Sequence, residues 1–426
     1  MDAFNNHIVT ASNMLKLKFK RLALCGAFIL GGASAVVAQD SGALLEVLVR
    51  KGIISDQEAE DIRADLVRDA SQPPAIATGG SNYTTRLRIS GRIQAQFAGL
   101  DTGIKNAPDN PSTNHFFMRR VYLTARADLG PDWNANLTYD FAGSLFDAAW
   151  VQWRQSGDLT FDFGLRKVNL GYEERTSSGS LKAIERSGVT RYFVEENNGR
   201  RLGGGSYRVG VFMDGKKGNF FYGAAVTNPE RAVNFTNAAG TGNGTNNGVA
   251  LWANAGYNRT FEGGTFLVGA GAGSLPDQGG KTLGTGNDME VYSVYTDVAV
   301  GSFGVAAEYL FANVERGASA TADAKPSGFW IQPTFKISEQ LEAVFRYSYL
   351  DSDGRGVNVS DGVRSAPSGA THNKLSEMFI GGNWYIKGND LKFQAGYVYG
   401  ESEDTVAGLP AEAKVHGVRS QLQLNF

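Results

Sequence analysis

The feature that most constrains this chain is an alternation of apolar and polar side chains, which begins at Arg86 and recurs as far as Phe426. In 86–97, polar residues occupy all the even positions and apolar or small residues occupy all the odd ones. A period of two is that of a β-strand with one apolar and one polar face. The pattern returns in 133–141, 159–166, 249–258 and 419–426. The chain after residue 85 is therefore predicted to be all-β.

The connections between these segments alternate between short and long. Short turns occupy 130–132, 155–158, 214–218, 262–264, 301–302, 338–340 and 387–390. Long loops rich in Gly, Asn, Ser and Ala occupy 98–115, 167–199, 229–248, 275–288, 315–326, 351–374 and 401–413. This spacing predicts sixteen strands, each near the ~9–11 residues that a tilted strand needs to cross a bilayer. Such a pattern is typical of an antiparallel bacterial outer-membrane barrel, which must close because an open edge leaves backbone groups unpaired in hydrocarbon.

Residues 1–38 have the pattern of a cleaved signal peptide. Basic residues between Lys16 and Arg21 precede an apolar stretch, and small residues ending at Ala38 form the expected cleavage site. The only cysteine of the chain, Cys25, lies in this segment. The exported protein is therefore predicted to fold without disulfides, and a closed hydrogen-bonded barrel would give it the stability that a disulfide otherwise supplies.

Between the signal peptide and the first strand, the periodicity is helical. Residues 39–71 predict a periplasmic helical hairpin, whose second helix opens with a capping box formed by Ser55 and Glu58. Residues 72–85, which contain a Pro pair and a Gly pair, predict a linker to the barrel of residues 86–426. The hairpin is interpreted either as an oligomerising or wall-contacting extension or as a solvated amphipathic arm.

The side chains that usually carry catalysis or bind metals are scattered. The histidines His7, His115, His372 and His416 have neither metal-ligand nor catalytic-triad spacing. The sequence GGKT at 279–282 lacks the preceding glycine and the following helix of a phosphate-binding loop. We therefore expect no enzyme activity, no cofactor, no metal and no nucleic-acid partner.

Several motifs stand out in the first half of the barrel segment. They are FFMRRVYL at 116–123, DFAG at 140–143, GLRKVNLGYEE at 164–174, TSS at 176–178, IERS at 184–187 and GRRLG at 199–203. Together they resemble the phosphate-selective porin O and P family. The resemblance implies a sixteen-stranded trimeric porin with a periplasmic N-terminal extension. Phe426, which ends an amphipathic strand, is similar to the signal that the barrel-assembly machinery reads.

In that family a column of arginines lines the pore. By alternation, the corresponding pore-lining residues here are Arg86, Arg88, Arg92, Arg120, Arg126, Arg166 and Arg208. Forked guanidinium groups suit phosphate and carboxylate, and rows of basic side chains favour anions in pores. The alternative is that facing acids offset these charges, the candidates being Asp128, Asp140, Asp162, Glu290, Glu308 and Glu342.

The loop 167–199 is the predicted constriction of the pore. Its charged residues, which resemble those of the family, are Lys167, Glu173, Glu174, Lys182, Glu185, Arg186 and Arg191. Mixed charges at a constriction set a transverse field on permeating solutes. The alternative is that ion pairs pin the loop to the barrel wall, most of all through Glu185 and Arg186.

The predicted function is that of an outer-membrane porin, a passive diffusion channel for small hydrophilic solutes that prefers anions, phosphate among them. The alternatives are a non-selective or substrate-specific channel without phosphate preference, and a barrel-borne surface adhesin or receptor. The expected partners are small inorganic or organic anions, outer-membrane lipid, the barrel-assembly machinery and further copies of the chain in a homotrimer. The expected location is the bacterial outer membrane.

Overall fold

The computed structural model describes residues 84–426, apart from 106–107, 109, 196–197, 230–247, 277–287, 320 and 406–411. The chain divides into two compact units at Pro74 and Ala75, and all of the described residues belong to the second unit. The predicted signal peptide, the helical hairpin and all but the last two residues of the predicted linker lie outside the described residues.

The described residues form mostly strands. The strands are β1 (Thr84–Ile104), β2 (Asn110–Leu129), β3 (Trp133–Asp140), β4 (Leu145–Arg154), β5 (Leu159–Lys167), β6 (Tyr207–Lys217), β7 (Phe220–Thr227), β8 (Ala250–Phe261), β9 (Gly264–Leu275), β10 (Met289–Val300), β11 (Phe303–Ser319), β12 (Ala322–Ala324), β13 (Ser327–Lys336), β14 (Leu341–Asp351), β15 (His372–Asn389), β16 (Leu391–Thr405) and β17 (Ala413–Asn425). The helices are α4 (Tyr172–Arg175), α5 (Gly188–Val194) and α6 (Val359–Gly362).

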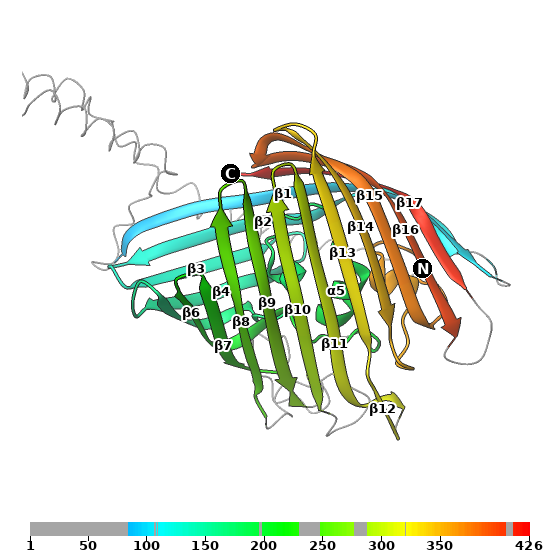
Figure 1. Ribbon diagram of the computed structural model, residues 1–426, viewed down its shortest axis with the longest axis horizontal. Helices are drawn as coiled ribbons and strands as arrows, with labels where there is room; N and C mark the ends of the chain where they lie inside the picture. Colours follow the sequence, from blue (N-terminus) through cyan, green and yellow to red (C-terminus); the bar gives the residue numbers. More distant parts are fainter. Residues whose placement is uncertain are drawn as a thin grey trace, which may run out of the picture. The chain divides into compact units, whose positions relative to one another are not determined.

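The strands close into one antiparallel barrel (Figure 1). Each wall strand pairs with its neighbours along the chain, and β1 pairs with both β2 and β17. The three-residue strand β12 pairs only with β11 and belongs to the connection between β11 and β13. The wall therefore has sixteen strands in the described part of the chain, and the predicted sixteen-stranded antiparallel barrel is confirmed.

The alternating pattern places apolar side chains on the outside of this wall. Along β13, Phe329, Ile331 and Phe335 are exposed, whereas Trp330 and Gln332 between them are buried on the inner face. The helices add no further crossing segment, since none in the described residues is long and apolar enough to span a membrane. The strands carry the apolar outer surface.

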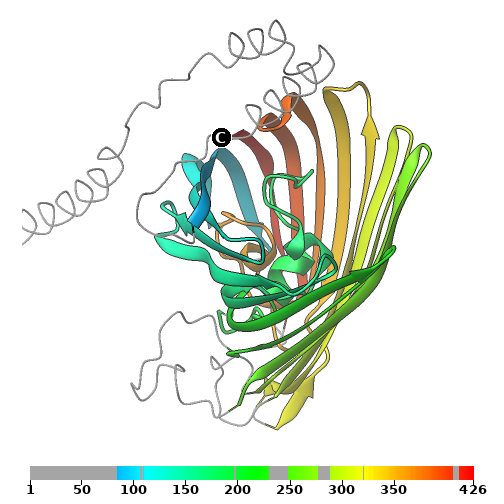
Figure 2. The ribbon, with the colours of Figure 1, turned by 90° about the vertical axis from the view of Figure 1, so that its left-hand side faces the viewer.

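Two long connections fold into the barrel. The connection between β5 and β6, residues 168–206, contains α4 and α5 and is here named the inner loop; Figure 2 shows α5 inside the curve of the strands. The connection between β14 and β15, residues 352–371, contains α6 and is named the clamp loop. The clamp loop falls within 351–374, one of the predicted long loops, whose direction the sequence leaves open. It folds inward, because α6 packs against α5, β15, β16 and β17.

The apolar core lies inside the barrel rather than outside it. Inward positions of β1 are polar at Gln94 and Gln96 but apolar at Ala98 and Leu100, which join a buried cluster with residues of both inward-folded loops. Further members of this cluster are Leu170, Ile184, Val189, Phe193, Leu202, Val359 and Val363. The sequence predicts a loop from residue 98, whereas β1 continues to Ile104. The alternation of polar and apolar residues stops at residue 98 because the inward side chains from there on contact apolar loop residues instead of water.

The C-terminal residue closes the seam at the short-turn end. Phe426 exchanges backbone hydrogen bonds with Gly91, the amide of Gly91 donating at 2.7 Å and that of Phe426 at 3.1 Å. A Cβ on Gly91 would lie 2.3 Å from the Phe426 ring, so the ring packs directly over this glycine. The role of Phe426 as an assembly signal stays a prediction.

Replacing Gly164 in β5 should disturb the wall. Its φ is +129°, and a Cβ would lie 2.3 Å from the carbonyl oxygen of Ala149 on β4. Forcing such a backbone costs about 1–3 kcal/mol before the clash is counted. Gly164→Ala should therefore lower the yield of folded, heat-modifiable barrel on gels. Gly157→Ala, in a turn with no atom within 4 Å of the added Cβ, is the control and should fold normally.

Candidate functional site

The inner loop is tied to the wall by ion pairs that cross the lumen. Glu173 accepts from Arg346 of β14 at 2.8 Å, and Lys182 donates to Glu342 of β14 at 2.8 Å. Glu185 accepts from Arg119 of β2 at 2.6 Å. The start of α4 is held by Glu308 of β11, whose carboxylate accepts the backbone N–H groups of Tyr172 and Glu173. The loop is thereby anchored on opposite sides of the barrel.

Other charged residues hold the inner loop in its own conformation. Arg186 pairs with Glu174 at 2.8 Å and donates to the carbonyl oxygens of Glu173, Glu174 and Thr176. Lys167 also pairs with Glu174 at 2.8 Å. Arg191 pairs with Glu195 at 3.2 Å. Thus six of the seven residues predicted for the constriction lie in the inner loop, and the seventh, Lys167, ends β5 just before it. Ion pairing describes the contacts of Glu185 and Arg186.

The clamp loop locks onto the inner loop. Arg364 donates to both Glu185, at 2.9 Å, and Glu195. Arg200 of the inner loop pairs with Asp361 of the clamp loop at 2.6 Å. Arg191 adds a hydrogen bond of 2.6 Å to the carbonyl oxygen of Gly362. The two loops therefore form one hydrogen-bonded unit inside the barrel.

The neighbouring arginines keep Glu185 and Glu195 ionised. We name these two residues, which both pair with Arg364 of the clamp loop, the clamping carboxylates. Burial by itself would raise the pKa of Glu185, but the charges of Arg119 and Arg364 outweigh it and hold that pKa well below its ordinary value. Burial likewise opposes ionisation of Glu195, and Arg364, Arg191 and Arg201 outweigh it and lower its pKa. Burial lowers the pKa of Arg191 to about 10, which still leaves it charged at neutral pH.

Between the inner loop and strands β1–β4 lies a cavity of about 760 Å³, here named the eyelet cavity. Eight basic residues line it, namely Arg92, Arg119, Arg120, Lys167, Arg175, Arg186, Arg201 and Arg364. Four acidic residues line it, namely Asp140, Asp147, Glu174 and Glu195. Formal positive charge is thus in excess around the cavity.

The excess is concentrated on arginines that contact only neutral groups. Arg92 donates to Asn425 at 2.8 Å and to Ser178 at 2.7 Å, and Arg120 donates to Gln94 at 2.8 Å. Within the described residues, neither forms an ion pair with a carboxylate. Glu174, by contrast, is paired with Lys167 and Arg186. Glu195 is paired with Arg201 and Arg364. Arg92 and Arg120 therefore present the uncompensated charge of this wall.

The two aspartates of the eyelet cavity are also engaged. Asp140 accepts the backbone N–H groups of Val121 and Ala142, and Asp147 accepts from the hydroxyl of Tyr207 at 2.7 Å. Neither carboxylate forms an ion pair with Arg92 or Arg120 in the described part of the chain.

The structure does not bring the seven predicted pore-lining arginines into one column. Arg88 is paired with Asp128 at 3.0 Å, and Arg166 is paired with Asp162 and, at 2.6 Å, with Asp214. Arg208 donates to the carbonyl oxygens of Gly203, Tyr207 and Pro229. Arg126 lies 5.9 Å from the ring of Trp150, and Arg86 stands opposite Asp128 in the strand register. Only Arg92 and Arg120 of the seven line the eyelet cavity.

Sequence reasoning missed several of the cavity's cations for identifiable reasons. Strict alternation would turn Arg119 outward, but the register slips between the pairs Gln94–Arg120 and Ala95–Met118, and this bulge turns Arg119 inward as well. The adjacent arginines in the FFMRRVYL motif were the available signal. Arg364 was missed because nothing in the sequence marked its loop as one that folds inward.

The structure also bears on one of the predicted lumen acids and on metal-binding groups. Glu290 was a candidate lumen acid, but it is exposed and alternates with the buried Met289, Val291 and Ser293 of β10, so that assignment is wrong. No group of three or more potential metal-binding side chains gathers among the described residues.

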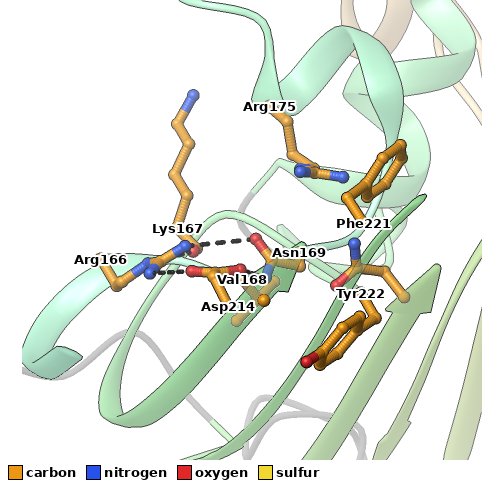
Figure 3. A pocket seen from close by; sticks show the side chains of 10 residues that line it. Arg166, Lys167, Val168, Asn169, Arg175, Asp214, Phe221 and Tyr222 are labelled. Atoms are coloured by element: carbon orange, nitrogen blue, oxygen red, sulfur yellow. Dashed lines mark hydrogen bonds and ion pairs between the residues drawn. The ribbon is translucent and has the colours of Figure 1, made fainter. Parts of the chain in front are cut away.

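A second cavity, of about 420 Å³, adjoins the inner loop toward the short-turn ends of β6 and β7 (Figure 3). Lys167 and Arg175 line both cavities. In Figure 3, Arg175 lies beside Phe221, and Arg166 points to Asp214 and Asn169. We name this space the lower cavity.

Comparison with known proteins agrees with the architecture. The family model for phosphate-selective porin O and P matches residues 87–426. The anion-selective porin of Comamonas acidovorans is similar in structure, with a TM-score of 0.55, 11% identity, and coverage of 79% of this chain and 99% of that chain. The outer membrane channel DcaP of Acinetobacter baumannii gives a TM-score of 0.49 at 14% identity, covering 80% and 97%. The sequence matches none of the curated proteins with which it was compared.

The lowered pKa values of Glu185 and Glu195 predict acid tolerance of the clamp. A carboxylate with a depressed pKa contributes stability above its ordinary pKa and loses it only as pH falls through the lowered value. Between pH 7 and about 4, near the ordinary glutamate pKa, the clamp should stay intact. The single-channel conductance of the reconstituted protein should therefore change no more than bulk conductivity does.

Glu185→Gln tests the same clamp without acid. It removes one partner of a buried pair, which costs about 3–5 kcal/mol, and should give unstable conductance already at pH 7. Glu339→Gln, in a short turn, is the control and should behave as the unmodified protein. A wild-type conductance that changes near the ordinary glutamate pKa would contradict the lowered pKa values.

Proposed function

Because the chain belongs to the phosphate-selective porin O and P family, we propose that it forms a diffusion channel that prefers anions. The protein is a porin of the bacterial outer membrane, with the closed barrel that this location requires. The anion preference is the step beyond the family and the fold. Passage of small hydrophilic solutes follows from a lumen lined by polar and charged side chains.

One observation carries the preference, namely the uncompensated charge of Arg92 and Arg120 on the wall of the eyelet cavity. A guanidinium held by neutral partners keeps its full charge, and in a partly dehydrated lumen that charge attracts anions and repels cations more strongly than in bulk water. Both side chains are fixed by hydrogen bonds, so the charge stays in place as solutes pass. The remaining eyelet cations mainly balance the clamping carboxylates.

The proposal narrows the arginine column to fewer residues. Arg88 is paired with one carboxylate and Arg166 with two, so an approaching anion meets no excess positive charge at either residue. Selectivity is therefore assigned to the eyelet and not to the full length of the lumen. The acidic residues that offset these two arginines are Asp128, Asp162 and Asp214, none of which lines the eyelet cavity.

Phosphate is proposed as one permeant anion. Forked N–H donors match the oxygen geometry of phosphate, and two arginines on one wall can share its charge. The family's description as phosphate-selective and the Comamonas porin's description as anion-selective point the same way. The homotrimer implied by the family stays a prediction, as does the role of the N-terminal hairpin.

The anion preference is tested by the reversal potential of reconstituted channels in a KCl gradient. The wild type should be chloride-selective. Arg92→Gln and Arg120→Gln should each lower the chloride-to-potassium permeability ratio by about three- to tenfold, which corresponds to about 0.7–1.4 kcal/mol. The matched control is the double variant Arg88→Gln/Asp128→Asn, which removes a compensated pair and should leave the ratio unchanged. A wild-type reversal potential at zero or on the cation side sinks the proposal.

Phosphate permeation is tested by block of the chloride current. Millimolar phosphate should reduce the current through the wild type because phosphate occupies the same arginines. The double variant Arg92→Gln/Arg120→Gln should raise the half-blocking concentration about tenfold, the equivalent of about 1.4 kcal/mol. A chloride-selective channel without millimolar block would favour the alternative of an anion channel without phosphate preference.

A further inference from the structure

The lower cavity is lined by an arginine, Arg175, whose charge no carboxylate balances in the described part of the chain. Arg175 of α4 donates to the hydroxyl of Tyr295 at 3.2 Å, and its guanidinium lies 5.9 Å from the ring of Phe221. It forms no ion pair with a carboxylate among the described residues. Because Arg175 also lines the eyelet cavity, an anion that leaves the eyelet meets this charge next.

The same cavity contains an unused hydrogen-bond acceptor. Asn254 of β8 lines it and is only 6% exposed, yet its Oδ1 has no hydrogen-bond partner in the described structure. The nearby Nδ2 group of Asn169 donates to Asp214 at 2.5 Å and forms no hydrogen bond with this oxygen. A buried carbonyl oxygen of this kind requires an O–H or N–H donor.

Gly223 leaves space in front of that buried acceptor. It stands opposite Asn254 in the pairing of β7 with β8, and a Cβ at this position would lie 2.5 Å from the Asn254 Oδ1. The same Cβ would lie 2.7 Å from the Asn169 Nδ2. A larger residue would therefore fill the space in front of both amides.

From this geometry we propose that the lower cavity is a subsite for hydroxylated organic anions, an inference that rests on the proposed anion channel and names a solute class for it. The anionic group binds Arg175, and a hydroxyl of the same solute donates to the Asn254 Oδ1. Chloride and simple carboxylates can satisfy the first contact but have no donor for the second. The cavity, at about 420 Å³, has room for a small hydroxy acid beside the arginine.

Lactate and propionate form the test pair, because they share a charge and a carbon skeleton and differ by one hydroxyl. Their permeability ratio is measured from reversal potentials with lactate on one side of a planar bilayer and propionate on the other. In the wild type, lactate should be favoured by about threefold, within what one net hydrogen bond contributes. Asn254→Leu, which keeps the size and removes the acceptor, should bring the ratio to about one.

Three further variants separate the two contacts from damage to the pore. Asn254→Asp keeps an acceptor and should retain the preference for lactate. Arg175→Gln should reduce the permeability of both organic anions relative to potassium. Asn136→Leu, on β3 and outside the lower cavity, is the control and should keep the wild-type ratio. Heat-modifiable migration on gels verifies folding of each variant.

The outcomes distinguish this proposal from the proposed function. A wild type that selects chloride over potassium but treats lactate and propionate alike overturns the subsite and leaves the anion channel standing. Retention of the lactate preference in Asn254→Leu also overturns it. A wild type without chloride selectivity overturns the anion channel itself, and with it the subsite.

Discussion

The structure depends on one constraint, which is that a sheet in hydrocarbon can have no unpaired edge. The pairing of β1 with β17 along the whole seam meets that constraint and joins the two ends of the barrel segment. Once the wall is closed, every strand has one face toward lipid and one toward the lumen. Many charged residues of this chain therefore lie in the lumen. There they either form ion pairs that involve the two inward-folded loops or stay available to water and solutes.

The charged residues of the lumen fall into two groups, those that hold the loops and those that act on solutes. Carboxylates such as Glu173 and Glu185 are engaged by wall arginines and hold the loops in place. Breaking such a buried pair leaves an uncompensated charge, so the loops are held firmly. Arginines with neutral partners, such as Arg92 and Arg120, retain a positive charge that acts on solutes in the lumen. The same residue type is thus structural or selective according to its partner.

The lumen also differs from a simple aqueous channel. At the long-loop ends of the strands, inward side chains such as Leu100 and Leu350 pack in a buried cluster with the loops. The hydrophobic effect therefore acts inside this barrel as well as at its outer surface. The eyelet cavity and the lower cavity are parts of the lumen that the loops leave open.

Sequence alone determined the barrel, its strand number and the inward direction of Arg92 and Arg120, because alternation is local and a closed wall allows only one face for each side chain. It also marked the constriction loop through motifs such as IERS. Only the tertiary structure decided that Arg119 turns inward, since a bulge depends on the pairing of two strands. It alone decided which arginines meet carboxylates, because ion pairs such as Arg346 with Glu173 join residues far apart in the chain. The sequence determines the charge of each residue, but which charges are balanced by a partner depends on the fold.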